Sequence, residues 1–384
     1  MKQNPNYALC KIEDTYYLLP FGQGIADHER GIQINETGAF LWNALAKPQS
    51  KEKLFEKCFI HYEASEEEIP GLTQDLSDFL FLLTSLGIII EDWKELPSEN
   101  DFSTKLQIGP LLLKLTALED VFPEEFRSFQ TTSTAPADLT ISLRSGVLPI
   151  LENGTQLIHN RELHVWEHTD CYHLLFPAAT ELTEAYLSKA GDYACIYHFP
   201  KHTATLTEEL LHAIRLIYLY TAQLHGCYAL HSASILYREK AWLFSGHSGM
   251  GKSTHTNLWN QLFKTPVLNG DLNLLAFCED EPVIYGIPWC GTSKRFVAKT
   301  YPLGGIVLLA RDEQDACVEL SPDQKALLTA QRLISPSWSK DMLHNHIQFT
   351  QRLSRQIHIC QLKCTKNDTA AYTMRTWIDA KFTS

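Results

Sequence analysis

Residues 241–254 read Ala-Trp-Leu-Phe-Ser-Gly-His-Ser-Gly-Met-Gly-Lys-Ser-Thr, and this stretch decides the fold. Ala241–Phe244 is an apolar run typical of a strand, and a helix is expected after the loop, to about Phe263. Between them, Gly246-x4-Gly251-Lys252-Ser253 has the spacing of a Walker A loop. A strand, a glycine-rich loop and a helix in this order predict a phosphate-binding site in an α/β domain.

The residue types in the loop suit the binding of a nucleotide. Gly249 and Gly251 permit backbone angles that turn N–H groups toward a phosphate, and the helix adds its positive N-terminal end. We expect Lys252 to contact the β- and γ-phosphates of ATP, and the Ser253 hydroxyl to ligate Mg²⁺. The expected nucleotide-binding residues are Gly246, His247, Ser248, Gly249, Met250, Gly251, Lys252, Ser253 and Thr254.

Two flanking segments narrow the class of P-loop protein. Leu230-His231-Ser232-Ala233-Ser234 precedes the loop, and Val267-Leu268-Asn269-Gly270-Asp271-Leu272 follows it. With the loop, they resemble HPr kinase/phosphorylase and phosphoenolpyruvate carboxykinase, closely over 225–310 and loosely over 105–384. The resemblance implies an α/β P-loop kinase domain at 96–384. That domain would comprise a β-rich flanking part at 105–225 and a nucleotide-binding core at 226–384.

The resemblance also implies roles for polar residues near the loop. Those families place two adjacent Asp residues where this chain has Gly270 and Asp271. Asp271 matches the metal-side position, so it is expected to bind Mg²⁺ together with Ser253, and the general base is left open. His231 is our candidate base beside the catalytic Lys252 and Asp271, because an imidazole accepts a proton near neutral pH. The alternative for His231 is a histidine that only packs at the start of a buried strand.

Residues 286–295, Gly-Ile-Pro-Trp-Cys-Gly-Thr-Ser-Lys-Arg, form the next candidate segment. The resemblance places this loop at the site, with Cys290 and Gly291 beside the substrate. Lys294 and Arg295 would neutralise phosphate charge in the transition state. The alternatives are a small buried thiol for Cys290 and ordinary surface positions for the two basic residues.

The first 95 residues predict a separate small α+β domain. Three strands are expected at 7–12, 15–19 and 32–34, and three helices at 36–46, 50–62 and behind a Ser65–Glu68 capping box to Leu86. Asn35 and Ser50 are expected to cap the first two helices.

This segment carries a second resemblance. Gly31-Ile-Gln-Ile-Asn-Glu-Thr-Gly-Ala-Phe-Leu-Trp-Asn-Ala-Leu45 resembles the PqqD-like peptide-recognition domain of pathways that modify ribosomally made peptides. The resemblance implies a winged-helix-like domain at 1–95 that binds the leader of a precursor peptide as an added strand. The edge at 30–34 and the helix at 71–86 would hold the peptide. The candidate contacts are Ile32, Ile34, Leu76 and Leu80.

The remaining segments carry less information. Residues 91–104 are polar and are predicted to be a linker. Short strands are expected at 139–143, 162–166 and 194–198, and a buried helix at 206–224. Further strands are expected at 229–236, 267–268 and 305–310, and a helix begins at Ser321-Pro322.

Composition excludes several classes of protein. The net charge of −12 argues against a general nucleic-acid or anionic-membrane surface. No run approaches the roughly 18 apolar residues that a membrane span needs, and the start lacks the apolar core of a secretory signal. The 10 cysteines include no Cys-x-x-Cys pair, as expected of thiols in a reducing, cytoplasmic compartment. The resemblance also allows a homo-oligomer.

These observations lead to one hypothesis and two alternatives. The hypothesis is a kinase that uses ATP and Mg²⁺ to phosphorylate a Ser or Thr hydroxyl of a precursor peptide held by the N-terminal domain. One alternative is a small-molecule kinase whose N-terminal domain is regulatory. The other is an adaptor that binds nucleotide and peptide without transfer, which the missing first Asp would permit.

Overall fold

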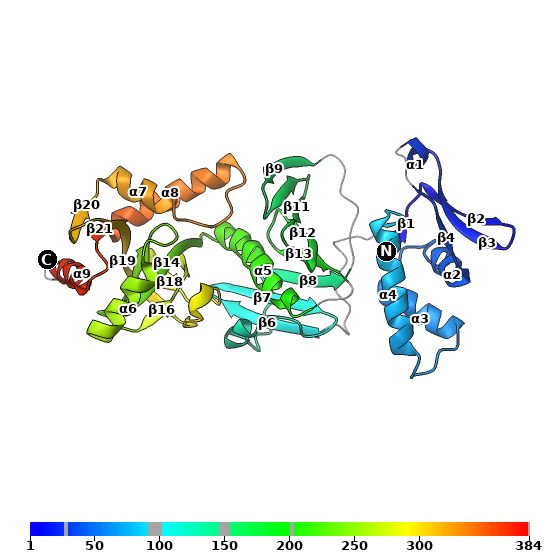
Figure 1. Ribbon diagram of the computed structural model, residues 1–384, viewed down its shortest axis with the longest axis horizontal. Helices are drawn as coiled ribbons and strands as arrows, with labels where there is room; N and C mark the ends of the chain where they lie inside the picture. The colour runs from blue at the N-terminus through cyan, green and yellow to red at the C-terminus, as the bar shows by residue number, and fades with distance from the viewer. Residues whose placement is uncertain (27–29, 91–101, 146–153, 200–202, 383–384) are drawn as a thin grey trace.

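The computed structural model describes residues 1–26, 30–90, 102–145, 154–199 and 203–382. Within these ranges the chain is a mixed α/β protein with large sheets. Figure 1 shows three parts in a row, with the N-terminal part at one end, a β-rich part in the middle and the C-terminal part at the other end. None of the described helices combines the length and the apolar character that a membrane crossing requires.

The N-terminal part contains the three strands and three helices that the sequence predicts, together with short additions. Its main sheet is antiparallel, in the order β2-β3-β4. The expected elements are β2 (Tyr7–Ile12), β3 (Thr15–Pro20), β4 (Ile32–Ile34), α2 (Glu36–Ala44), α3 (Lys51–His61) and α4 (Ile69–Ser85). The additions are β1 (Lys2–Gln3), α1 (Gln23–Ala26) and β5 (Ile89–Ile90).

Polar side chains explain where these helices begin. Asn35 Oδ1 accepts the Gly38 N–H at 2.9 Å, and Ser50 Oγ accepts the Lys53 N–H at 3.4 Å, as the N-cap predictions require. Half of the predicted capping box is present: the Glu68 carboxylate reaches back and accepts the Ser65 N–H at 3.0 Å, but Ser65 does not cap the helix. Glu68 rather than Ser65 is the N-cap of α4, and Ser65 Oγ donates to the Glu68 carboxylate at 2.7 Å instead of accepting a backbone N–H.

The N-terminal part has its own hydrophobic core, whose buried members all lie within residues 1–89. It also touches the β-rich part: Lys51 Nζ donates to Ser145 Oγ at 3.2 Å, and the rings of Phe81 and Phe199 lie 5.7 Å apart. The predicted boundary at residues 95 and 96 lies outside the described residues. The predicted linker ends too late, because β6 (Phe102–Ile108) already begins at Phe102.

The β-rich part is one sheet of 8 strands in the order β6-β7-β8-β13-β12-β11-β10-β9. The predictions at 139–143, 162–166 and 194–198 correspond to β8, β10 and β13. The strands other than β6 are β7 (Leu111–Ala117), β8 (Leu139–Ser145), β9 (Thr155–His159), β10 (His164–Glu167), β11 (Cys171–Leu175), β12 (Leu182–Ser188) and β13 (Tyr193–His198). A 3₁₀ helix, η1 (Glu124–Phe129), follows β7.

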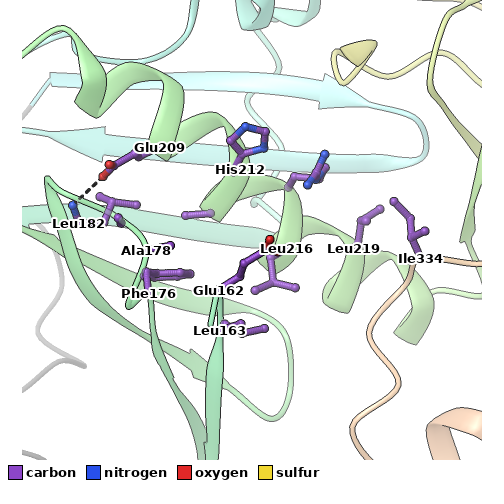
Figure 2. Close-up of a pocket in the computed structure, with 13 residues that line it drawn as sticks. Glu162, Leu163, Phe176, Ala178, Leu182, Glu209, His212, Leu216, Leu219 and Ile334 are labelled. Atoms are coloured by element: carbon purple, nitrogen blue, oxygen red, sulfur yellow. Dashed lines mark hydrogen bonds between the residues drawn. The ribbon is translucent and has the colours of Figure 1, made fainter. Parts of the chain in front are cut away.

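Helix α5 (Thr205–Leu224) lies against one face of this sheet, close to the range predicted for it. The helix and the sheet do not meet along the whole helix. They leave a cavity of about 620 Å³, bordered by side chains such as Phe176, Leu216 and Ile334 (Figure 2).

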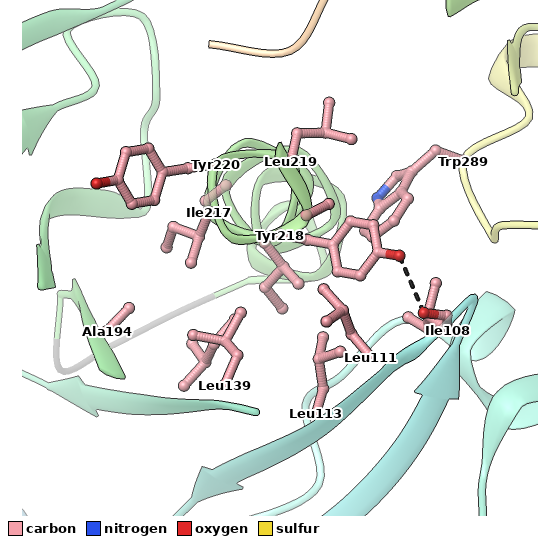
Figure 3. Close-up of a cluster of buried hydrophobic side chains, with 14 of the residues drawn as sticks. Ile108, Leu111, Leu113, Leu139, Ala194, Ile217, Tyr218, Leu219, Tyr220 and Trp289 are labelled. Atoms are coloured by element: carbon pink, nitrogen blue, oxygen red, sulfur yellow. Dashed lines mark hydrogen bonds between the residues drawn. The ribbon is translucent and has the colours of Figure 1, made fainter. Parts of the chain in front are cut away.

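Elsewhere α5 packs tightly on the sheet (Figure 3). Ile217 and Tyr218 belong to the same buried cluster as Leu113 and Leu139, and the Tyr218 hydroxyl donates to the Ile108 carbonyl at 2.9 Å. The cluster extends into the C-terminal part and includes Trp289. The β-rich and C-terminal parts therefore share one hydrophobic core.

The C-terminal part is built on a second sheet of 8 strands, in the order β15-β14-β17-β18-β19-β21-β20, with β16 beside β14 and an extra pairing of β15 with β19. Its strands are β14 (Tyr228–Tyr237), β15 (Lys240–Ser245), β16 (Val267–Asn269), β17 (Leu272–Cys278), β18 (Glu281–Tyr285), β19 (Thr300–Arg311), β20 (Ala316–Glu319) and β21 (His358–Cys364). Its helices are α6 (Lys252–Phe263), η2 (Gly291–Ser293), α7 (Pro322–Ala330), α8 (Lys340–Gln356) and α9 (Asp368–Ala380).

Alternating side chains place helices on both faces of this sheet. Ala241 and Leu243 of β15 belong to a cluster that includes Phe349 of α8. Trp242 and Phe244 of the same strand belong to a cluster that includes residues of α6 and α9. This period of two is the pattern of a strand covered on both sides.

Candidate active site

The glycine-rich loop joins the carboxyl end of β15 to the first turn of α6. β15 runs parallel to β19, and β19 runs parallel to β21, so the carboxyl ends of three strands meet at this edge. Gly249 and Gly251 have φ values of 74° and 100°, where a side chain would be strained. The loop therefore has the backbone that its sequence predicts, at the edge where open α/β sheets bind ligands.

Lys252 is only 9% exposed and lies over its own loop, with Nζ 3.4 Å from the Gly246 carbonyl oxygen. Burial lowers the pKa of this ammonium, while the charge of Asp271 raises it. Among the described residues, Lys252 makes no ion pair within 4 Å. A desolvated cation without a close counter-charge is suited to bind an anion such as phosphate.

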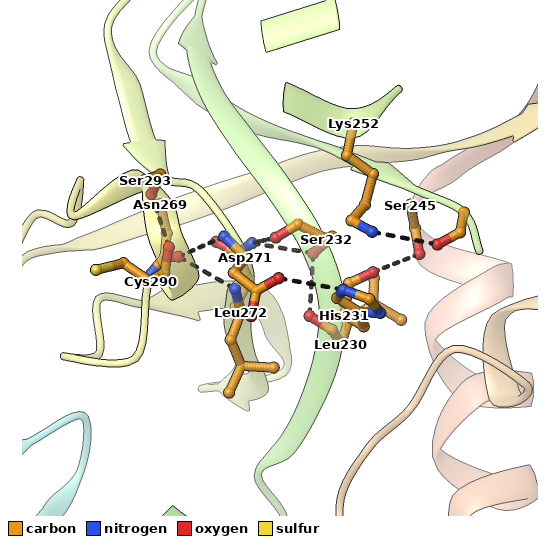
Figure 4. A network of polar contacts seen from close by, with 12 residues as sticks. Leu230, His231, Ser232, Ser245, Lys252, Asn269, Asp271, Leu272, Cys290 and Ser293 are labelled. Carbon is orange, nitrogen blue, oxygen red and sulfur yellow. Dashed lines mark hydrogen bonds and ion pairs between the residues drawn. The ribbon is translucent and has the colours of Figure 1, made fainter. Parts of the chain in front are cut away.

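His231 and Asp271 form a hydrogen-bonded pair beside the loop (Figure 4). His231 Nε2 lies 3.1 Å from Asp271 Oδ1, and the two side chains are 31% and 34% exposed. The hydrogen bond from His231 holds the pKa of Asp271 below its ordinary value, and the charges of Lys252 and Arg215 lower it further. The structure thus brings the three predicted catalytic residues near one another: His231 and Asp271 share a hydrogen bond, and Lys252 and Asp271 influence each other through their charges.

Asn269 fixes the turn that carries Asp271, and it is not among the site residues predicted from the sequence. Its Oδ1 accepts the backbone N–H groups of Asp271 at 2.9 Å and Leu272 at 3.1 Å, and its Nδ2 donates to the Ile287 carbonyl at 3.2 Å. Asn two residues before Asp271 is the local signal of such an Asx turn.

The position of the absent first Asp has no room for a side chain. A Cβ atom on Gly270 would lie 2.0 Å from Ser293 Oγ and 2.5 Å from Ser293 Cβ. Ser293 is itself held in place, because its hydroxyl donates to the Cys290 carbonyl at 2.7 Å. Glycine at 270 therefore belongs to a close contact between two loops.

The loop at 286–295 packs directly against Asp271. A Cβ atom on Gly291 would lie 2.9 Å from Asp271 Cβ, and Gly291 has a positive φ of 59°. Trp289 anchors the loop on α5, since its indole Nε1 donates to the Leu211 carbonyl at 2.9 Å. This segment therefore forms one wall beside the Asp271 carboxylate.

The other predicted residues of this loop, Cys290, Lys294 and Arg295, are not placed to act on a substrate at Asp271. Cys290 is 5% exposed, and burial raises the pKa of its thiol, so it is neutral and poorly placed to react. Lys294 and Arg295 are exposed, and neither side chain makes a hydrogen bond or ion pair with another described residue. The structure therefore does not bring these two cations to Asp271.

Arginines from distant elements contact the phosphate loop instead, and the sequence analysis missed them. Arg332 reaches His247, with Nη2 2.9 Å from the ring atom Nε2, and Arg311 donates to the Gly249 carbonyl at 2.7 Å. The charge of Arg332 also lowers the pKa of Lys252. Arg332 follows α7, and Arg311 is the last residue of β19, so no local motif connects them with the loop.

The available oxygen donors suit Mg²⁺ held mainly by phosphate and water. The described residues contain no group of three or more His, Cys, Asp or Glu side chains that could hold a metal ion. Mg²⁺ in nucleotide sites needs only one or two protein oxygens. The ionised Asp271 carboxylate and the exposed Ser253 hydroxyl at the start of α6 are of the right chemical type.

A second candidate site lies in the N-terminal part. β4 pairs only with β3 among the described strands, so its other edge is open. A cavity of about 640 Å³ beside this edge is bordered by Ile34 of β4 and by Asp75, Leu76 and Phe79 of α4. Ile34, Leu76 and Leu80 are all buried members of the core of this part, and Leu80 does not border the cavity. Ile32 is half-buried and does not border the cavity.

Comparison with known proteins does not identify the family or the activity of this chain. No family model matches the chain, and no curated protein matches it. The Hpr(Ser) kinase/phosphatase from Coxiella burnetii matches over 40% of this chain and 94% of its own, at 8% sequence identity and a TM-score of 0.25. Likeness at this level supports no conclusion about activity, and the PqqD-like character of the N-terminal part stays a resemblance of sequence alone. We therefore assign the chain to no family.

Proposed function

We propose that this protein is an ATP-dependent kinase that phosphorylates a Ser or Thr hydroxyl of a precursor peptide. The observation that carries the proposal is the convergence of the Walker A lysine, Lys252, with the hydrogen-bonded pair of His231 and Asp271. Phosphoryl transfer needs little covalent chemistry from a protein. It needs cations around the phosphate, a positioned acceptor and a group that takes the acceptor proton.

His231 is suited to take that proton. With Nε2–H donated to Asp271, the other ring nitrogen, Nδ1, is left as an acceptor, and it has no hydrogen-bond partner among the described residues. Asp271 would stabilise the imidazolium that forms when Nδ1 accepts the hydroxyl proton. This arrangement would supply a base in place of the additional Asp that serves as the base in the HPr kinase family, which the sequence resembles.

Cations on the other side of the site would hold the nucleotide. Lys252 and the backbone N–H groups of the loop would bind the phosphates, and Arg332 stands beside the loop at His247. When bound, Mg²⁺ would neutralise negative charge on the phosphates, held by Asp271 and Ser253. Together these groups favour direct transfer in line from ATP to the hydroxyl.

The N-terminal groove supports a peptide as the acceptor. It combines an open strand edge at β4 with apolar side chains of α4, which is the combination that binds an extended peptide by strand addition. A leader bound there would raise the local concentration of the attached acceptor near Lys252. The acceptor is therefore proposed to be a peptide rather than a free metabolite.

The deciding experiment is intact-mass analysis of peptides encoded beside this gene after incubation with the protein, ATP and Mg²⁺. We expect a mass gain of one phosphate that is lost in Lys252→Ala and weakened when residues 1–95 are deleted. A phosphorylated metabolite with unmodified peptide would overturn the peptide substrate.

One observation favours a second candidate, a nucleotide- and peptide-binding adaptor without transfer. Ser293 fills the space beside Gly270, so the additional Asp is absent and cannot be accommodated without rearrangement. Tight ATP binding with no phosphate on any acceptor would establish this candidate and exclude His231 as a working base.

A further inference from the structure

The cavity between α5 and the β-rich sheet is not explained by nucleotide or leader binding. It measures about 620 Å³, large enough for a small ligand or a few amino-acid side chains. Much of its wall is apolar, including Leu163, Phe176 and Leu216, which Figure 2 shows around the space beside α5. The polar side chains in the wall are Glu162, Glu209, His212 and Arg215.

Arg215 is the unusual member of this wall. Its guanidinium is partly buried, yet it makes no hydrogen bond or ion pair with any residue in the described ranges. A guanidinium has five N–H donors, and leaving them without acceptors away from water is unfavourable. An anion from outside the chain would satisfy them.

The two wall carboxylates do not serve as that partner. Glu209 is already fully engaged, since its oxygens accept the backbone N–H groups of Thr180, Glu181 and Leu182 at 2.7 to 3.0 Å. Glu162 is exposed and makes no ion pair with Arg215. Among the described residues that line the cavity, Arg215 is the only permanent cation.

The cavity lies near the proposed active site, although His231, Lys252 and Asp271 do not line it. Trp289 donates to the carbonyl of Leu211, which precedes the cavity residue His212, and the loop that carries Trp289 packs on Asp271 at Gly291. The charge of Arg215 is close enough to Asp271 to lower the pKa of that carboxyl. Ile334 closes the cavity from the side of the C-terminal part, and Arg332, two residues earlier, contacts His247 of the phosphate loop. A ligand that pairs with Arg215 would therefore lie on the same side of the molecule as the reacting groups.

We propose that this cavity is the acceptor pocket, and that the accepted substrate carries a carboxylate on an apolar body, the carboxylate pairing with Arg215 while its hydroxyl reaches His231. This inference rests on the proposed kinase function and names the class of acceptor. The carboxylate belongs either to a chain terminus or to an acidic side chain next to an apolar residue, which is the same chemistry at Arg215.

Binding of two fragments tests the pocket directly. The probes are 3-phenylpropanoate and its uncharged analogue 3-phenylpropanamide, titrated against the full chain by ligand-observed NMR. We expect the acid to bind at least about tenfold more tightly than the amide, because a charge-assisted pair with Arg215 is available only to the acid. Equal binding of acid and amide to the wild-type protein would overturn the proposal without any variant.

Variants then locate the preference. Arg215→Gln should remove the preference for the acid, Arg215→Lys should keep part of it, and Arg161→Gln should leave it unchanged. Arg161→Gln is the matched control. It removes the same positive charge at the residue before Glu162, but Arg161 does not line the cavity. A circular dichroism spectrum and a melting temperature equal to those of the wild type confirm that Arg215→Gln is folded. A preference that survives in folded Arg215→Gln would place the carboxylate elsewhere.

Two serine-containing peptides distinguish the two sources of the carboxylate. The first ends in phenylalanine with a free C-terminal carboxylate. The second has an amidated C-terminus and carries its carboxylate on an aspartate side chain. The one that competes with 3-phenylpropanoate identifies the source, and competition by neither would overturn the proposal. Failure of the kinase function looks different: the acid would still bind at Arg215, but no peptide would gain phosphate.

Discussion

At the scale of single residues, the proposed chemistry depends most on His231. If its Nδ1 accepts the hydroxyl proton, His231→Gln should lower the rate of phosphoryl transfer by roughly 100-fold or more, the usual worth of a positioned base. ATP affinity should change little, because the contacts of Lys252 with the loop are untouched. Single-turnover transfer and equilibrium ATP binding measure the two quantities. An unchanged transfer rate in His231→Gln would show that His231 is not the base and only packs in the structure.

The contact between Gly270 and Ser293 gives a second prediction. Gly270→Ala should destabilise the protein by about 1–3 kcal/mol, because a Cβ there would meet Ser293 Oγ at 2.0 Å. Ser293→Gly should cost less and should relieve most of the penalty in the double variant. Urea denaturation of all four proteins gives the coupling energy. Additive changes in the free energy of unfolding would show that residues 270 and 293 do not interact, and would contradict the proposed contact.

The site was predictable from the sequence only where its residues are local in the chain. The Walker A spacing pointed to Gly249, Gly251 and Lys252, and the resemblance of the flanking segments to two kinase families pointed to His231 and Asp271. Arg215, Arg311 and Arg332 were missed, because each reaches the site from a separate element through packing that no short pattern encodes. The role of Lys294 and Arg295 was inferred from the resemblance, and in the structure both residues are exposed and their side chains have no described partner.

At the scale of elements, the predictions held for segments with a strong local period or cap. Strands β2, β3, β14 and β15 and helices α2, α3, α5 and α6 lie close to their predicted ranges. In the β-rich part, strands β6, β7, β9, β11 and β12 were missed. The pairing of β8 with β7 and β13 is parallel, and β13 lies far along the chain from β8. Such pairing depends on the whole sheet and leaves little trace in a local window.

Helix α6 carries a buried histidine whose ionisation opposes folding. His255 is 2% exposed and stacks on Phe244, and burial lowers its pKa to about 4. The unfolded chain binds this proton near pH 6.5, so between pH 6.5 and 4 the unfolded state holds more protons and stability falls as pH falls. Between pH 7 and pH 5 the loss should be about 2 kcal/mol.

Urea denaturation at both pH values checks this. His255→Asn, which cannot titrate, should be weaker at pH 7 but should lose about 2 kcal/mol less than wild type on going to pH 5. An equal loss in both proteins would mean that His255 protonates without cost in the folded state.

At the scale of the whole molecule, the N-terminal groove between β4 and α4 and the phosphate loop lie in different parts of the row in Figure 1. Binding at the groove should therefore act on the acceptor through the connecting peptide. We expect excess free leader peptide to raise the apparent KM for the full precursor, while transfer to a core peptide without a leader is unchanged. Initial rates at several leader concentrations measure this. Inhibition of both acceptors would contradict separate sites.

The hydrophobic core shared by α5, the β-rich sheet and residues such as Leu272, Ile287 and Trp289 has a consequence for how the chain comes apart. Cutting the polypeptide near residue 225 would leave each fragment with half of a continuous apolar surface facing water. Residues 102–382 should therefore melt as one cooperative unit, while the N-terminal part, with its own core, melts apart from them.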